Sequence, residues 1–208
     1  MYLRLFSVKV HYKNIPEYFH FYKTKAMPEF AKAEGCRFAG LLENMDDPEK
    51  MISLTLWEES GQSSQFESSN IYKDLLEENK TFLSESSDLN IKTAEEQNIE
   101  VATYDVTART DLIQQFPDDS EKMKVRILSI KVKDGQIDAF KKLYIETIIP
   151  EIKDIPGLSY DYLTESVTDQ HEFISVTIWE NEERLNDYLE KGQFKKPLQS
   201  VSYTLDEI

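Results

Sequence analysis

A gapless internal repeat constrains the fold of this chain more than any other feature of its sequence. The segment ISLTLWE at residues 52–58 returns as ISVTIWE at residues 174–180, an offset of 122 residues, and the same offset aligns LRLFSVKV at 3–10 with VRILSIKV at 125–132. Solenoid repeats have periods of roughly 20–50 residues, so a period this long predicts that each copy is a small domain with several elements of its own.

Both copies predict the same order of elements. A strand rich in Val, Ile, Leu and Phe is followed by a helix with one apolar stripe, by two strands joined in a hairpin, and by a second helix. A proline near the end of the first helix should kink or restart it, and a glycine then closes it. The predicted strands span 2–10, 36–44 and 50–57 in the first copy and 124–132, 158–166 and 172–179 in the second; the prolines are Pro28 and Pro150, the glycines Gly35 and Gly157.

This order predicts an α+β fold, in which each half is a ferredoxin-like repeat with helices on one face of an antiparallel sheet. Apolar residues occur at both odd and even positions of the strands, for example Leu3 and Leu5 on one face and Phe6 and Val8 on the other. Each sheet therefore needs cover on its second face. We expect the two halves to press these faces together, giving an internal pseudo-dimeric α+β barrel.

The repeat also predicts the domain boundaries. Residues 1–83 form the first domain and residues 123–208 the second, whereas the acidic segment 84–122 has no counterpart in the second half. Within it, IEVATYDVTART at 99–110 alternates like an extra strand between loop-like stretches. We expect a connecting arm whose strand pairs with a sheet edge and masks it.

Charge and composition narrow the classes of partner. The net charge is −15 and the pI about 4.7, which disfavours binding to nucleic acid or to anionic lipid head groups. No apolar run is long enough for a membrane span, and the N-terminus reads as a strand rather than a signal peptide. The only cysteine is Cys36, so no intrachain disulfide can form. A cytoplasmic location is expected.

The sequence contains no recognisable cofactor or metal motif. Its three histidines, His11, His20 and His171, are not spaced as ligands on one element. A glycine-rich phosphate loop, a G-x-S-x-G motif and a paired C-x-x-C are also missing from the sequence. We therefore expect no metal and no cofactor.

The pattern resembles the antibiotic biosynthesis monooxygenase family, whose domains form dimeric α+β barrels. The features that match are the first strand, the helix ending near Gly35 or Gly157, and the strand ending in LWE or IWE. The helix ending in SSNIYKDL or KGQFKKPL matches as well. The resemblance covers nearly the whole chain except the arm. It implies that the usual homodimer of this family is replaced here by two domains on one polypeptide.

The resemblance also supplies candidate site residues. Haem-degrading relatives carry a tryptophan and a haem-ligating histidine in the second helical region; this chain has Phe66 and Tyr188 at the tryptophan position and leucine, Leu76 and Leu198, at the histidine position. Leucine cannot ligate iron, so haem degradation through that site is disfavoured. The residues implied to line a substrate pocket are Phe66 and Tyr188, together with Ser7 and Ser129, which replace the asparagine of the first strand.

Matched aromatic residues complete the candidate site. Tyr22 and Tyr144 occupy equivalent positions on the inner stripe of the first helix, where a phenol could orient or protonate a substrate oxygen. The competing interpretation makes both of them core residues with satisfied hydroxyls. Trp57 and Trp179 end matched strands and either wall a pocket or simply pack the core. A buried member of the repeated acids, Glu43 with Glu165 or Glu58 with Glu180, would have a raised pKa and could act as a base.

These observations favour a cofactor-independent monooxygenase-like enzyme, an oxidoreductase acting on a small aromatic or quinol-type metabolite. Of the two halves, the first has the more aromatic helix and is the better guess for a working pocket. Two alternatives stay open at this point, because fold alone does not select a function. One is a ligand-binding or protein-interaction module of the same fold without catalysis, and the other is a small-metabolite isomerase.

Overall fold

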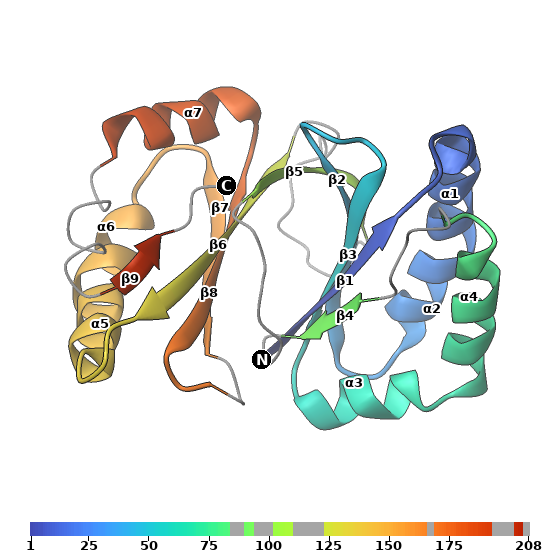
Figure 1. Cartoon of the computed structure of the whole chain (residues 1–208), viewed down its shortest axis with the longest axis horizontal. Coiled ribbons are helices and arrows are strands. Elements are labelled where there is room, and N and C mark those ends of the chain that lie inside the picture. Colours follow the sequence, from blue (N-terminus) through green and yellow to red (C-terminus); the bar gives the residue numbers. More distant parts are fainter. Residues whose placement is uncertain (84–89, 94–101, 110–122, 166–168, 193–201, 206–208) are drawn as a thin grey trace. The chain divides into compact units, whose positions relative to one another are not determined.

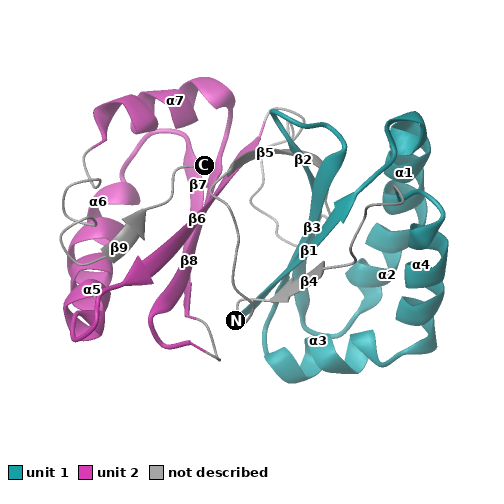
Figure 2. Ribbon diagram, in the orientation of Figure 1, with its two compact units in different colours: residues 1–93, 105–121 teal, residues 94–104, 122–208 magenta. Residues whose placement is uncertain are grey.

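Two compact units make up the computed structural model of the chain (Figure 2). The structure describes residues 1–83, 90–93, 102–109, 123–165, 169–192 and 202–205. Unit 1 contains residues 1–93 and 105–121, and unit 2 contains residues 94–104 and 122–208. The strand expected within 99–110 is present as β5 (Ala102–Arg109).

Unit 1 follows the predicted order of elements (Figure 1). Its antiparallel strands lie in the order β4-β1-β3-β2, the order of a ferredoxin-like sheet. The elements are β1 (Tyr2–Lys9), the 3₁₀ turn η1 (Tyr12–Asn14), α1 (Ile15–Phe21), the π-helical segment η2 (Tyr22–Ala26), α2 (Met27–Lys32), β2 (Cys36–Asn44), β3 (Lys50–Trp57), α3 (Ser60–Glu67), α4 (Asn70–Lys80) and β4 (Asn90–Thr93).

Unit 2 repeats this arrangement with strand order β9-β6-β8-β7, again antiparallel. Its elements are β6 (Lys124–Val132), α5 (Ile137–Leu143), the π-helical segment η4 (Tyr144–Ile148), α6 (Ile149–Ile152), β7 (Leu158–Glu165), β8 (Glu172–Trp179), α7 (Glu182–Lys191) and β9 (Ser202–Leu205). The α+β class and the two ferredoxin-like repeats with antiparallel sheets are thus confirmed. The packing of one sheet against the other stays a prediction. Within the described ranges, every helix is too short or too polar to span a bilayer.

The prolines divide the first helix of each unit as expected. Pro28 and Pro150 have no N–H to donate to the carbonyl four residues earlier. The backbone widens instead into a five-residue π segment, closed by Met27 N–H donating to Tyr22 O in unit 1 and by Ile149 N–H donating to Tyr144 O in unit 2. The α-helix restarts directly after each segment, with proline in its first turn.

One helix expected in the first half is in fact two. The chain turns at Ser68 and Ser69 between α3 and α4, because the Ser69 hydroxyl accepts a hydrogen bond from Tyr72 N–H (3.1 Å) and caps a new helix. The residues of the first helix are buried to different degrees. Tyr18, Phe21 and Tyr22 are buried, whereas Ile15 and Phe19 are only partly buried.

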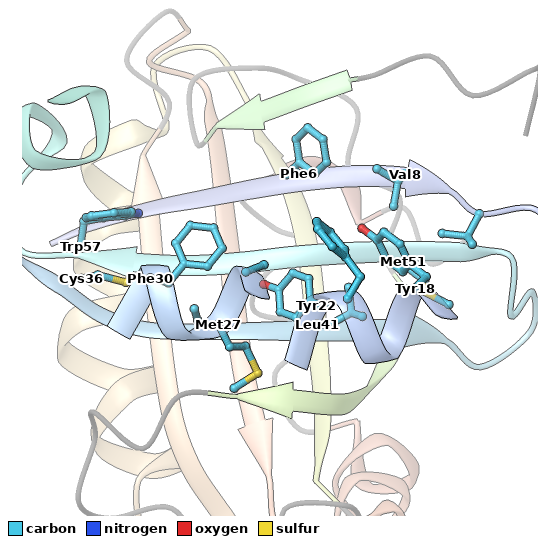
Figure 3. Close-up of a cluster of buried hydrophobic side chains, with 14 residues drawn as sticks. Phe6, Val8, Tyr18, Tyr22, Met27, Phe30, Cys36, Leu41, Met51 and Trp57 are labelled. Atoms are coloured by element: carbon cyan, nitrogen blue, oxygen red, sulfur yellow. The ribbon is translucent and has the colours of Figure 1, made fainter. Parts of the chain in front are cut away.

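Each unit buries an apolar cluster between its helices and one face of its sheet. Figure 3 shows part of the unit 1 cluster, in which Tyr22, Met27 and Phe30 on the helix lie over Leu41, Met51 and Trp57 on the strands. In unit 2, Phe140, Tyr144 and Ile148 pack in the same way against a cluster that includes Leu128, Ile130 and Phe173. This helix-facing side of each sheet is where the candidate site lies.

Gly35 has a backbone that only glycine adopts readily, and it touches the start of α3. Its φ is 77°, and a Cβ at this position would collide with the Gln62 side chain. That side chain accepts the Glu59 N–H at the N-terminus of α3 (3.1 Å), so the glycine leaves room for the helix cap. Gly157 occupies the equivalent place in unit 2, with φ 87° and Arg184 as its close neighbour.

Gly35→Ala should therefore lower the free energy of unfolding by about 1–3 kcal/mol, from left-handed backbone strain plus displacement of Gln62. Gly61→Ala is the matched control, because Gly61 lies in α3 with open space where a Cβ would project. The control should stabilise the protein slightly, by about 0.5–1 kcal/mol. Urea unfolding monitored by circular dichroism measures both. Equal effects of the two variants would contradict the packing described here.

Candidate active site

A buried phenol begins each π segment and reaches a serine on the central strand of the sheet. The Tyr22 hydroxyl lies 2.7 Å from Ser53 Oγ and 3.3 Å from Gly40 O. The Tyr144 hydroxyl lies 2.7 Å from Ser175 Oγ. Each pair is a polar point inside an otherwise apolar cluster. π segments occur frequently at functional sites, and both tyrosines are the residues proposed as catalytic from the sequence.

Burial holds both phenols in their protonated form. Desolvation raises the pKa of Tyr22, and it raises the pKa of Tyr144 well above its ordinary value. The hydrogen bond from each serine acts in the opposite direction and is weaker. At neutral pH the two hydroxyls can donate or accept hydrogen bonds, but they cannot act as bases.

A buried arginine pairs with an acid and a phenol in unit 1. Arg4 is 2% exposed, and its Nε lies 3.0 Å from Glu67 Oε1, an ion pair without hydrogen-bond geometry. The guanidinium donates a hydrogen bond to the Tyr72 hydroxyl and lies over the Tyr72 ring at 5.0 Å. The Ser63 hydroxyl donates to the same Glu67 oxygen (2.8 Å). The charge of Arg4 is therefore satisfied within its own unit.

A small cavity of about 40 Å³ lies between these groups and the helices of unit 1. Its polar lining residues are Arg4, Tyr18, Tyr22, Ser53, Tyr72 and Asn79. An apolar cavity that binds benzene measures roughly 150 Å³ in a well-studied case, whereas a single water needs about 10–15 Å³. The unit 1 cavity thus has room for about three waters, and an aromatic ring could enter only if side chains moved.

Unit 2 contains a carboxyl group where unit 1 has none. Asp161 on β7 corresponds to Ala39 on β2 at the repeat offset. Tyr144 donates a hydrogen bond to Asp161 Oδ1 (3.1 Å), and because a phenol has one proton, Ser175 then donates to Tyr144. Burial raises the pKa of Asp161 to about 6, opposed by the hydrogen bond from Tyr144. This carboxyl is ionised at neutral pH yet more basic than an ordinary aspartate.

The aromatic residues proposed as pocket walls are packed close to these sites. Trp57 is buried against Phe66 with ring centroids 5.6 Å apart, and Trp179 lies 4.8 Å from Tyr188 in the same way. Each indole donates to a threonine on its own strand (2.9 Å), Thr55 in unit 1 and Thr177 in unit 2. Neither Trp57 nor Phe66 lines the unit 1 cavity. Their roles in substrate binding stay predictions.

The two serines proposed from the first strand are not brought together with the tyrosines. Phe6 and Val8 on β1 belong to the helix-facing cluster, so Ser7, one residue out of phase, lies on the other face of the sheet. Ser129 lies on the other face in unit 2 for the same reason, since Leu128 and Ile130 face the helices.

Of the repeated glutamates, Glu58, Glu165 and Glu180 are exposed and therefore cannot serve as a buried base, and the histidines form no metal site among the described residues. Glu58 and Glu165 are exposed and form ion pairs with Arg37 and Lys141. His20 is exposed, as the helix pattern predicts. No group of three or more His, Cys, Asp or Glu residues that could hold a metal occurs in the described part of the chain.

Asp161 is not among the residues predicted from the sequence, because it does not recur in both copies. The signal that could have found it is the opposite one. At a helix-facing position of a predicted strand, one copy has alanine and the other a carboxylate. A charged residue at a position that the repeat itself marks as buried calls for a partner or a function.

Comparison with known proteins supports the resemblance. A family model described as antibiotic biosynthesis monooxygenase matches residues 123–198. The sequence matches no curated protein. Among solved structures, a candidate monooxygenase from Lactobacillus acidophilus NCFM is 13% identical with a TM-score of 0.70, and the match covers 98% of this chain and 89% of that one.

Two further structures match along nearly the whole chain. A candidate monooxygenase from Fusobacterium nucleatum subsp. nucleatum ATCC 25586 is 10% identical with a TM-score of 0.70, covering 98% of this chain and 88% of that one. An anthrone oxidase-like protein is 11% identical with a TM-score of 0.56, covering 98% and 87%. At these identities the matches show a common fold.

The Arg4 ion pair should be important for the stability of unit 1. Glu67→Gln leaves the buried guanidinium without a counter-charge, and we expect the free energy of unfolding to fall by about 1–3 kcal/mol, discounted because Glu67 is 29% exposed. Glu77→Gln is the control, since Glu77 pairs with Lys80 at the surface and is 73% exposed; it should change stability by less than about 0.5 kcal/mol. Chemical denaturation of both variants at neutral pH compares them.

Asp161 should destabilise the folded protein at neutral pH. Burial raises the pKa of Asp161 in the folded state, so folding favours the protonated carboxyl. The resulting stabilisation is fully present below the ordinary pKa of 3.8 and is lost as pH rises through about 6, where the carboxyl ionises. The difference between the two pKa values corresponds to a change of at most about 3 kcal/mol in the free energy of unfolding. Asp161→Asn should therefore stabilise the protein above pH 6, with a gain that shrinks toward pH 4, as measured by thermal unfolding across this range. A pH-independent change would show that Asp161 is not desolvated.

Proposed function

We propose that the chain is a cofactor-independent monooxygenase acting on a small phenolic or quinol-type ring, a proposal that starts from the match of residues 123–198 to the family model of antibiotic biosynthesis monooxygenases. The observation that carries the proposal is the phenol–serine pair at the start of each π segment, a polar point set in an apolar cluster between helices and sheet. If side chains move to admit an aromatic ring, such a place can engage one oxygen on it.

The chemistry needs only the substrate and dioxygen. A phenol loses its proton to a base, and the resulting phenolate passes electrons to O₂ as a carbon–oxygen bond forms at the ring. The hydroperoxide then breaks its O–O bond, the ring carbon loses its hydrogen as a proton, and water leaves. The net reaction converts a phenol and O₂ to a quinone and water. The protein contributes a dry pocket, a proton acceptor and donors for the developing oxyanion.

The buried tyrosines suit the role of hydrogen-bond donors. Because burial raises the pKa of both phenols, their hydroxyls stay protonated at any physiological pH. In unit 1, where no carboxylate takes the proton of Tyr22, this hydroxyl can orient a substrate oxygen and stabilise negative charge on it, whereas in unit 2 Tyr144 donates to Asp161 and positions that carboxylate. In the state described here, the small cavity of unit 1 would have to open before a ring could bind.

Oxygen consumption tests the proposal directly. The purified chain is mixed with a panel of naphthalene and benzene quinols in an oxygen electrode, with catalase and superoxide dismutase present to remove the products of autoxidation. We expect consumption above the uncatalysed rate, and Tyr144→Phe should lower kcat by about 10²-fold because the hydroxyl that positions the carboxylate of Asp161 is lost. Tyr12→Phe is the control, since Tyr12 is 66% exposed and lies outside both clusters.

Other outcomes separate the remaining candidate functions. Tight binding of these ligands without oxygen uptake or product would contradict catalysis and identify a binding module. Conversion of a ligand to an isomer under anaerobic conditions would identify an isomerase.

A further inference from the structure

We propose that Asp161 is the proton acceptor of the site and that unit 2, rather than the more aromatic unit 1, turns over the substrate. This inference rests on the proposed function, to which it adds the residue that starts the reaction. The proton step is simple: the substrate O–H bond breaks, the proton moves to Asp161 Oδ2, and the electron pair stays on the substrate oxygen as a phenolate.

The two oxygens of Asp161 differ in their surroundings. Oδ1 accepts the hydrogen bond from Tyr144 at 3.1 Å. Oδ2 is buried and has no hydrogen-bond partner among the described residues. A buried acceptor without a donor is unfavourable in a folded protein, typically by about 1–3 kcal/mol, unless a ligand or water supplies the donor. A substrate hydroxyl is such a donor, and the carboxylate is oriented for it by Tyr144 through Oδ1.

Asp161 ends a polar row that crosses the sheet of unit 2 on the helix-facing side. Arg126 on β6 pairs in register with Thr177 on β8, and Thr177 pairs in register with Asp161 on β7. The backbone positions of Arg126 and Asp161 are thus two strand spacings apart, about 10 Å. A ring lying across the row would have a carboxylate at one edge and a guanidinium toward the other.

The electrostatic neighbours of Asp161 come from every element around it. Tyr144 faces it from η4, Tyr188 from α7 and Arg126 from β6, while β8 contributes the hydroxyls of Ser175 and Thr177. The pKa of Tyr188 is raised mainly by burial; the charge of Arg126 acts to lower it and that of Asp161 to raise it, so both charged groups lie close enough to act on Tyr188. Glu165, farther along β7, is exposed and paired with Lys141 at 2.7 Å.

The same row in unit 1 lacks a base. Ala39 stands at the position of Asp161, so Arg4 and Thr55 have no carboxylate in register with them on β2. The acid of unit 1 is Glu67, on α3 instead of on the sheet, and it is already engaged by Arg4 and Ser63. Leu189 stands at the equivalent place in unit 2. The acid has changed element between the two copies, and in unit 2 it has a buried oxygen, Asp161 Oδ2, without a hydrogen-bond partner among the described residues.

The pH dependence of turnover tests this inference. Because burial raises the pKa of Asp161 to about 6, kcat/KM for the quinol consumed fastest should fall about tenfold per pH unit below that value. Asp161→Asn should lower kcat/KM by about 10²- to 10⁴-fold and remove the acid limb of the profile. Glu165→Gln, on the same strand but exposed, should leave both the rate and the profile unchanged. Thermal unfolding verifies that each variant is folded.

A binding experiment keeps this inference separate from the proposed function. Under anaerobic conditions above neutral pH, 4-nitrophenol binds as its phenolate, and an Asp161 that shares a proton with it must take up about one proton per site. Calorimetry in buffers of different ionisation enthalpy measures that uptake, which should vanish in Asp161→Asn.

Each combination of results has a defined meaning. Proton uptake without oxygen consumption by any quinol would support Asp161 as the acceptor and overturn the oxygenase proposal. Oxygen consumption with an unchanged rate and acid limb in Asp161→Asn would overturn the inference and leave the oxygenase proposal standing. Absence of both uptake and consumption would overturn both.

Discussion

The missing N–H of one proline in each unit determines how the candidate site is built. Pro28 and Pro150 cannot complete the α-helical ladder, so the backbone widens into a π segment that starts at a tyrosine. The π segment lies against the sheet, and its first residue places the phenol hydroxyl within hydrogen-bond distance of a serine on the neighbouring strand. A side chain with a polar tip can be buried there because the tip finds a partner. The helix before the proline and the helix after it both pack on the same cluster, so the irregular turn is held in place from both ends.

Both units have this helix and sheet arrangement, but they differ in how their buried charged residues are paired. In unit 1 the guanidinium of Arg4 pairs with Glu67 and donates a hydrogen bond to Tyr72, while Arg4 Nε and Asn79 Oδ1, beside the same cavity, have no hydrogen-bond partner among the described residues. In unit 2 the carboxyl of Asp161 is held by Tyr144 on one oxygen only. The first arrangement pairs a buried charge with an opposite charge. The second leaves one buried carboxylate oxygen, Asp161 Oδ2, without a hydrogen-bond partner among the described residues. Ionisable residues whose pKa is shifted by burial, as that of Asp161 is, are often found in the active sites of enzymes.

Much of this fold could be predicted from the repeat, because agreement between two copies averages out local ambiguity. The strand bounds and the restart of the helix at Pro28 and Pro150 were evident in the pattern. The same method located Tyr22 and Tyr144. It failed where the copies disagree or where a contact joins distant elements. Ser69 divides a helix that periodicity alone reads as continuous. The partner of Arg4 lies on α3, 63 residues away, and Asp161 has alanine as its counterpart, so neither could be found by matching the halves.

The exchange of Ala39 for Asp161 has a consequence for how such a protein can change over time. In a homodimer a single codon specifies both sites, so a costly buried charge appears twice whenever it appears at all. Two copies on one chain remove that coupling. Each site can then accumulate substitutions independently. The destabilisation caused by a buried reactive group has to be tolerated only once per molecule. The unit with alanine at this position then contributes stability that can offset the buried carboxylate of the other unit.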